Sequence, residues 1–219
     1  MGADKIQWAH HTWWGCDWSE PHRWNRAAEG AGERHRVFCC ASMADVFEDR
    51  PDLAAARARL AALIRETPAL DWLLITKRPE NAARLWADAW AASWNGADSL
   101  GFEWANIWLG TTVESQAMAD ERIPHLLRVP ARGHFLSCEP LLGRVNLHRW
   151  LCKHATDNQM EQRWMSSWCD PSGSISWVII GGESGPKARP CAEEWIGDLV
   201  EQCLVAEVPA FVFPAGGAR

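Results

Sequence analysis

Side chains that can bind a small ligand recur along this chain where short apolar segments end. Each of these segments is followed at once by carboxylates, hydroxyls or cations. Glutamates in such positions can bind a ribose diol, a substrate amine or a metal ion, whereas lysine and arginine can hold a carboxylate or a phosphate. The residues that we single out for cofactor or ligand binding are Thr76, Lys77, Arg78, Thr112, Glu114, Ser137, Glu139, Gly181, Gly182, Glu183, Ser184 and Arg189, and Ser42 and Asp45 follow an earlier segment in the same way.

The richest of these segments is ISWVIIGGESGPKARP, at residues 175–190. Its apolar start is too short for a helix and rich in β-branched residues, which predicts a buried strand. The double glycine that follows lets the backbone turn sharply and lets a ligand approach the main chain. Taken alone, this segment fits a ligand-binding loop and an ordinary strand-to-helix turn with solvated charges equally well.

Apolar runs and helical spacing alternate along the chain. We expect strands at residues 36–41, 71–76, 106–112, 134–138, 175–180 and 210–213, with helices at 53–67, 80–90, after Ser115 and at 191–208. Pro124 is expected to kink or end the third of these helices. Such alternation predicts an α/β fold with a parallel sheet and right-handed crossovers. A partial (β/α) barrel of about six parallel strands with flanking helices fits this length, and an open doubly wound sheet is the alternative.

The carboxyl ends of parallel strands lie along one edge of their sheet, so the polar residues listed above should gather there. Polar loops would also arise without any ligand. However, acids and cations placed directly after the last strand residue in each case favour a ligand site. No Walker loop, G-x-G-x-x-G fingerprint or G-x-S-x-G elbow occurs, and no Asp-rich spacing supports a metal site built from three carboxylates.

Composition limits the classes of function. We expect a single domain over residues 1–219, with an irregular, Trp-rich lead-in at 1–35 and an inserted loop at 152–174. The net charge of −6 gives no support for nucleic-acid binding. The N-terminal residues do not resemble a signal peptide and no apolar run reaches the ~18 residues of a membrane span, so we expect a cytoplasmic protein with no membrane partner.

Four motifs at the ends of the expected strands together resemble a known family. LLITKRPEN (73–81), IWLGTTVESQAMADERIPHLL (107–127), FLSCEPLLG (135–143) and WVIIGGESGPKARP (177–190) are similar to the bacteriophage-type radical-SAM-like family, and VFCCASMADVFED (37–49) and RWNR (23–26) extend the match. Some members occur beside a three-Cys-motif partner protein. The resemblance implies a bacterial or phage-encoded partial barrel that binds S-adenosylmethionine and a [4Fe–4S] cluster, and it implies a partner protein for some members.

The chain departs from that pattern where the cluster should bind. TWWGC (12–16) resembles the start of the cluster segment, which makes Cys16 the candidate metal ligand, but the second and third cluster cysteines are missing. We therefore expect a degenerate radical-SAM-like protein that keeps a nucleoside or S-adenosylmethionine pocket at the strand rim. Two alternatives stay open: an active enzyme whose cluster is completed by other cysteines or by a partner, and a non-catalytic interaction module that uses the Trp-rich N-terminus.

Overall fold

The fold is α/β, as predicted. The computed structural model describes residues 18–39, 45–93, 104–151 and 175–213, and of Phe38 and Cys39 it describes the backbone only. Six parallel strands follow one another in sequence order in one sheet, which forms a half-barrel with flanking helices. The strands are β1 (His35–Cys39), β2 (Leu70–Thr76), β3 (Ile107–Thr112), β4 (Gly133–Cys138), β5 (Ile175–Ile180) and β6 (Ala210–Val212).

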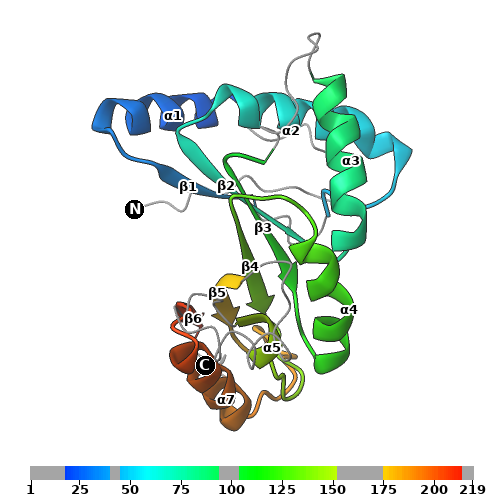
Figure 1. Cartoon of the computed structure of the whole chain (residues 1–219), viewed down its shortest axis with the longest axis vertical. Helices are drawn as coiled ribbons and strands as arrows, with labels where there is room; N and C mark the ends of the chain where they lie inside the picture. Colours follow the sequence, from blue (N-terminus) through cyan, green and yellow to red (C-terminus); the bar gives the residue numbers. More distant parts are fainter. Residues whose placement is uncertain (1–17, 40–44, 94–103, 152–174, 214–219) are drawn as a thin grey trace, which may run out of the picture. The chain divides into compact units, whose positions relative to one another are not determined.

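Helices follow most of the strands along the chain (Figure 1). They are α1 (Glu20–Ala31), α2 (Ala54–Glu66, preceded by the 3-10 turn η2 at Pro51–Leu53), α3 (Pro79–Ala92), α4 (Gln116–Leu127), the short α5 (His148–Leu151) and α7 (Glu193–Val205). Among the described residues, no helix combines the length and the apolar character that crossing a membrane requires.

Contacts divide the chain into two compact units. The first comprises residues up to Gly110 together with Val129–Arg132, and the second comprises Thr111–Arg128 together with the chain from Gly133 onward. The single domain that the sequence predicts stays a prediction. The inserted loop at 152–174 lies outside the described residues.

In the first unit, β1 pairs with β2 in parallel, with Val37 opposite Trp72, and α2 packs against α3. Trp72 and Trp86 are fully buried, and the Trp72 indole donates a hydrogen bond to the Thr67 hydroxyl at 3.0 Å. Phe47 packs edge-on against Trp86, with ring centroids 6.2 Å apart. The loop that carries Asp45 is therefore anchored in this core two residues further on.

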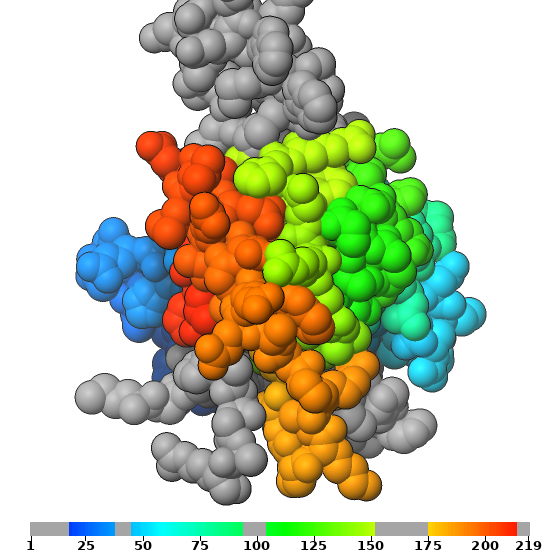
Figure 2. Space-filling model, turned by 90° about the horizontal axis from the view of Figure 1, so that it is seen from below, coloured from blue at the N-terminus to red at the C-terminus, as the bar shows by residue number. Residues whose placement is uncertain are grey.

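In the second unit, β4 pairs with β5 and β5 with β6, both in parallel. Helix α7 packs on β5 and β6, and Figure 2 shows it (orange) beside the segment around residues 140–151 (yellow-green). The side chain of Arg144 joins the two by ion pairs with Glu194 and Asp198. The side-chain amide oxygen of the buried Gln202 accepts a hydrogen bond from the Leu147 N–H at 2.6 Å.

One local expectation was wrong, and a second was excluded in part. The lead-in at 1–35 was expected to be irregular, yet residues 20–31 form α1, which begins with Pro21 in its first turn and ends at Gly32 with φ 67°. Pro124 was expected to kink or end α4, and the helix does not end there but continues to Leu127. Proline at that point removes one N–H whose acceptor would be the carbonyl of the exposed Asp120, so one lost hydrogen bond does not end the helix.

Candidate functional site

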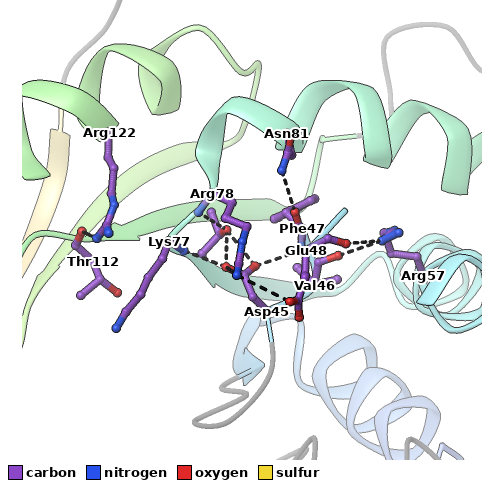
Figure 3. Close-up of polar contacts among 11 residues, drawn as sticks. Asp45, Val46, Phe47, Glu48, Arg57, Lys77, Arg78, Asn81, Thr112 and Arg122 are labelled. Atoms are coloured by element: carbon purple, nitrogen blue, oxygen red, sulfur yellow. Dashed lines mark hydrogen bonds and ion pairs between the residues drawn. The ribbon is translucent and has the colours of Figure 1, made fainter. Parts of the chain in front are cut away.

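In the first unit, the polar residues at the strand ends form a cluster around the Asp45 carboxylate (Figure 3). This carboxylate accepts hydrogen bonds from the Thr76 hydroxyl at 2.8 and 2.9 Å, from the Lys77 N–H at 2.9 Å and from the Phe47 N–H at 2.9 Å. The Arg78 guanidinium forms an ion pair with it at 3.4 Å. The carboxylate is thus occupied by donors of its own chain, and it ties the loop after β1 to the end of β2.

The buried Arg57 side chain stabilises the same loop. The Arg57 side chain is only 3% exposed, and its guanidinium donates to the backbone carbonyls of Val46, Glu48 and Arg50 at 3.3–3.4 Å. Burial lowers the pKa of Arg57 from its ordinary value. Because three carbonyls of this loop accept from one guanidinium, Arg57 stabilises the backbone that follows Asp45.

Lys77 and Arg78 were predicted to hold a carboxylate or a phosphate of a ligand. The Arg78 guanidinium instead lies between Asp45 and Glu48, at 3.4 and 3.6 Å. The Lys77 side chain is exposed, and within the described part of the chain its ammonium meets no hydrogen-bond acceptor. The Asp45 cluster therefore holds the loop after β1 against the end of β2, and we call it the latch. Lys77 is its one outward-facing cation among the described residues.

In the second unit, Glu114 is neutralised by an arginine that the sequence analysis missed. The Arg122 guanidinium, from α4, donates to the Glu114 carboxylate and to the Thr112 carbonyl, both at 2.8 Å (Figure 3 shows the Thr112 contact). The Arg122 side chain is only 13% exposed. Glu114 is thus a paired carboxylate next to the end of β3.

Backbone hydrogen bonds bring the ends of β3, β4 and β5 together. The loop after β4 donates from the Leu141 N–H to the Gly181 carbonyl and from the Leu142 N–H to the Glu114 carbonyl, each at 2.9 Å. The Val113 N–H donates to the Ser137 carbonyl at 2.8 Å. These bonds place Glu114, Ser137, Glu139 and Gly181, four of the predicted residues, around one edge of the second unit, which we call the Glu139 rim.

Glu139 differs from its neighbours on this rim because its carboxylate has no partner in the part of the chain that the structure describes. It is half-buried, and burial alone raises its pKa above the ordinary value. Among the residues that the structure describes, none donates a hydrogen bond to it or forms an ion pair with it. A Cβ built on Gly181 would lie 3.4 Å from the Glu139 Cγ, so the missing side chain at Gly181 leaves the space that Glu139 occupies.

The remaining predicted residues lie on the loop after β5. Glu183 accepts three hydrogen bonds from Arg189, the shortest at 2.7 Å, and these bonds lower the pKa of Glu183. Ser184 is exposed on the loop that this pair closes. A Cβ on Gly182 would lie 3.0 Å from the Cys191 Cβ, so a larger residue there would press on Cys191.

Metal ligation is the part of the prediction that the described residues do not support. Cys16, the candidate metal ligand, lies outside them. In the part of the chain that the structure does describe, no group of three or more His, Cys, Asp or Glu side chains is placed to hold a metal ion. The three free thiols there, Cys138, Cys191 and Cys203, all have pKa values raised by burial, which disfavours the thiolate that iron binds.

The comparisons with known proteins give a family without an activity. No curated protein and no solved structure matches the chain. A family model described as a protein of unknown function (DUF5131) matches residues 5–218, which is nearly the whole length. The chain therefore belongs to the DUF5131 family.

Proposed function

We propose that this member of the DUF5131 family is a degenerate radical-SAM-like protein that binds a nucleoside or S-adenosylmethionine-type ligand at the Glu139 rim. One observation carries the proposal. Glu114 on this rim is paired with Arg122, and Glu183 on the adjoining loop after β5 is paired with Arg189, whereas Glu139 has no partner among the described residues. A partly desolvated carboxylate is costly unless a partner compensates it, and a ligand can be that partner.

The chemistry of the rim favours a ligand with hydrogen-bond donors or a positive charge. An amino group, a sulfonium or a ribose diol would each satisfy the Glu139 oxygens, and S-adenosylmethionine carries all three. The two paired carboxylates add no net charge, so the rim presents about one negative charge to the ligand. Gly181 leaves room for Glu139 and Phe213, which flank the position of its missing side chain.

The proposed activity is ligand binding, and it involves no iron–sulfur cluster. The described thiols do not fit a cluster, because Cys138 and Cys203 are buried and none of the three free thiols is poised as a thiolate. Two alternatives stay open. In one, Cys16 and a partner complete a cluster, and in the other, the Trp-rich N-terminus serves interaction alone. The experiments below distinguish both from ligand binding.

The test is equilibrium dialysis of the purified protein with S-adenosylmethionine. We expect Glu139→Gln to weaken binding by roughly tenfold or more, since a hydrogen bond to a charged group is worth ~1.5–3 kcal/mol. The matched control is Glu121→Gln, which removes an exposed carboxylate from α4 of the same unit and should leave binding unchanged. If the unaltered protein does not bind at millimolar ligand, the interaction module is favoured.

A second measurement separates binding from radical chemistry. The protein is treated anaerobically with iron and sulfide, and its iron content and visible absorbance are then measured. We expect no stoichiometric four-iron cluster in the isolated chain. A stable cluster would overturn the degenerate assignment and favour the active enzyme.

A further inference from the structure

One face of β4, β5 and β6 carries aromatic side chains that lead to the Glu139 rim. Phe135 lies opposite Trp177 in the β4–β5 pairing, and their rings stack with centroids 4.9 Å apart. Ile179 lies opposite Phe211 in the β5–β6 pairing. Since alternate residues of a strand point to the same side, the next residues on this face are Glu139, Gly181 and Phe213.

The Gly181 contacts confirm that Glu139 and Phe213 share this face. A Cβ on Gly181 would lie 3.2 Å from the Phe213 Cβ on one side and 3.4 Å from the Glu139 Cγ on the other. The Phe213 N–H also donates to the Ile180 carbonyl at 2.8 Å, which continues the β5–β6 ladder past its last pair. Phe213 and Glu139 therefore flank the glycine that separates them.

The opposite face is covered at β4 and β5, whereas Val212 of the edge strand β6 is 41% exposed there. Cys138 and Ile180 point to that side and are fully buried, and charge interaction with Cys203 of α7 contributes to the raised pKa of Cys138. On the Glu139 side, by contrast, Phe211 is 55% exposed and Phe213 is 42% exposed. Their rings meet edge to face, with centroids 4.9 Å apart and planes at 76°. Two large aromatic rings thus remain accessible on the face that carries Glu139, whose carboxylate has no partner among the described residues.

We propose that Phe213, supported by Phe211, and Glu139 form a subsite for a planar aromatic ring that is linked to a cationic group. The ring of the ligand would stack on the exposed Phe213 face, and its cation would bind the Glu139 carboxylate. The negative faces of the phenyl rings also attract a positive charge, so the two halves of the subsite favour the same class of ligand. This inference rests on the proposed function and adds the class of ligand.

A flat apolar partner surface fits these residues less well. Covering Phe211 and Phe213 with such a surface would also bury Glu139 without a partner, and an unpaired buried carboxylate is strongly unfavourable. A ligand that brings its own positive charge covers the rings and compensates the carboxylate together. The adjoining charge therefore decides between a docking patch and a ligand subsite.

The test compares four probes by equilibrium dialysis: S-adenosylmethionine and tryptamine, which carry ring and cation, adenosine, which carries the ring alone, and S-methylmethionine, which carries the cation alone. We expect Phe213→Leu to weaken S-adenosylmethionine and tryptamine by roughly tenfold, as base–aromatic stacking usually contributes, and to leave S-methylmethionine unchanged. Leucine keeps the Cβ beside Gly181, and Phe211→Leu is a second, milder variant. Leu204→Ala, at an exposed apolar residue of α7, is the control and should change nothing.

The outcomes separate this inference from the proposed function. Tryptamine that binds through Phe213 while S-adenosylmethionine does not bind would keep the subsite and overturn the proposed function. S-adenosylmethionine that binds equally to the unaltered protein and to both phenylalanine variants would do the reverse. Absence of binding by every ring-bearing probe, or equal weakening of S-methylmethionine, would overturn the subsite.

Discussion

Two carboxylates at strand ends, Asp45 in the first unit and Glu139 in the second, have opposite environments. Asp45 accepts hydrogen bonds from a hydroxyl and from two backbone N–H groups, and it pairs with a guanidinium. Glu139 is also withdrawn from water, but no donor among the described residues compensates it. A carboxylate that follows a strand therefore serves structure in the first unit, and we propose that it serves ligand binding in the second.

The two carboxylates differ because hydrogen-bond donors surround Asp45 but not, among the described residues, Glu139. In the first unit, the chain supplies them from the loop itself, and the buried Arg57 holds that loop in shape. In the second unit, Arg122 and Arg189 pair with Glu114 and Glu183 and leave Glu139 without a cation among the described residues. Pairing status, rather than the number of acidic residues, is what distinguishes a latch from a candidate site.

Substitution of Asp45 is expected to have the largest effect on stability and tests its structural role. Asp45→Ala leaves the buried donors around it without an acceptor, so we expect the free energy of unfolding to fall by about 2–4 kcal/mol. Denaturant unfolding measures this. The control is Asp49→Ala, which removes an exposed ion pair with Arg84 and should cost at most about 1 kcal/mol. Equal effects of the two substitutions would contradict the latch.

Arg57→Met tests whether the loop under Asp45 depends on its buried cation. The substitution leaves three carbonyls short of a donor, and we expect a loss of about 1–2 kcal/mol, partly offset because a desolvated charge is also removed. Arg26→Met, at an exposed position of α1, is the matched control and should lie within about 0.5 kcal/mol of the unaltered protein. Thermal unfolding of both variants gives the comparison.

Gly181→Ala sharpens the description of the rim. The added methyl group would press on Phe213 and Glu139, and such overpacking usually costs about 1–3 kcal/mol. We expect a value near the lower end, because Glu139 can shift toward solvent, together with weaker S-adenosylmethionine binding. A Cβ on Gly143 would meet no atom within 4 Å, so Gly143→Ala should change neither stability nor binding. A silent Gly181→Ala would mean that the glycine is not needed there.

The smallest expected effect has an unusual sign. Burial raises the folded-state pKa of Glu139, so the folded protein binds a proton more tightly than the unfolded chain, and stability falls as the pH rises from the ordinary carboxyl pKa through the raised one. Above that window, Glu139→Gln should therefore stabilise slightly, by no more than about 0.5 kcal/mol for a half-exposed group. Unfolding measured at two pH values checks this, and a clear loss of stability at neutral pH would show that Glu139 has a structural partner.

The strands and their polar ends were predictable because buried parallel strands are continuous apolar runs with abrupt polar endings. Residues 175–180 were assigned exactly, and Ser115 caps α4 as its position suggested. The pairing of Arg122 with Glu114 was not predictable, since it depends on how α4 folds back over β3. Helix α1 was missed because its tryptophan, proline and glycine residues hide any apolar period.

The central claim is that an unpaired Glu139 carboxylate binds a cationic ligand, and the pH dependence of S-adenosylmethionine affinity tests it most directly. We predict that affinity in the unaltered protein falls as the pH is lowered through the raised pKa of Glu139, while the weaker affinity of Glu139→Gln stays nearly constant over the same range. Parallel pH profiles of equal affinity for the two proteins would contradict it.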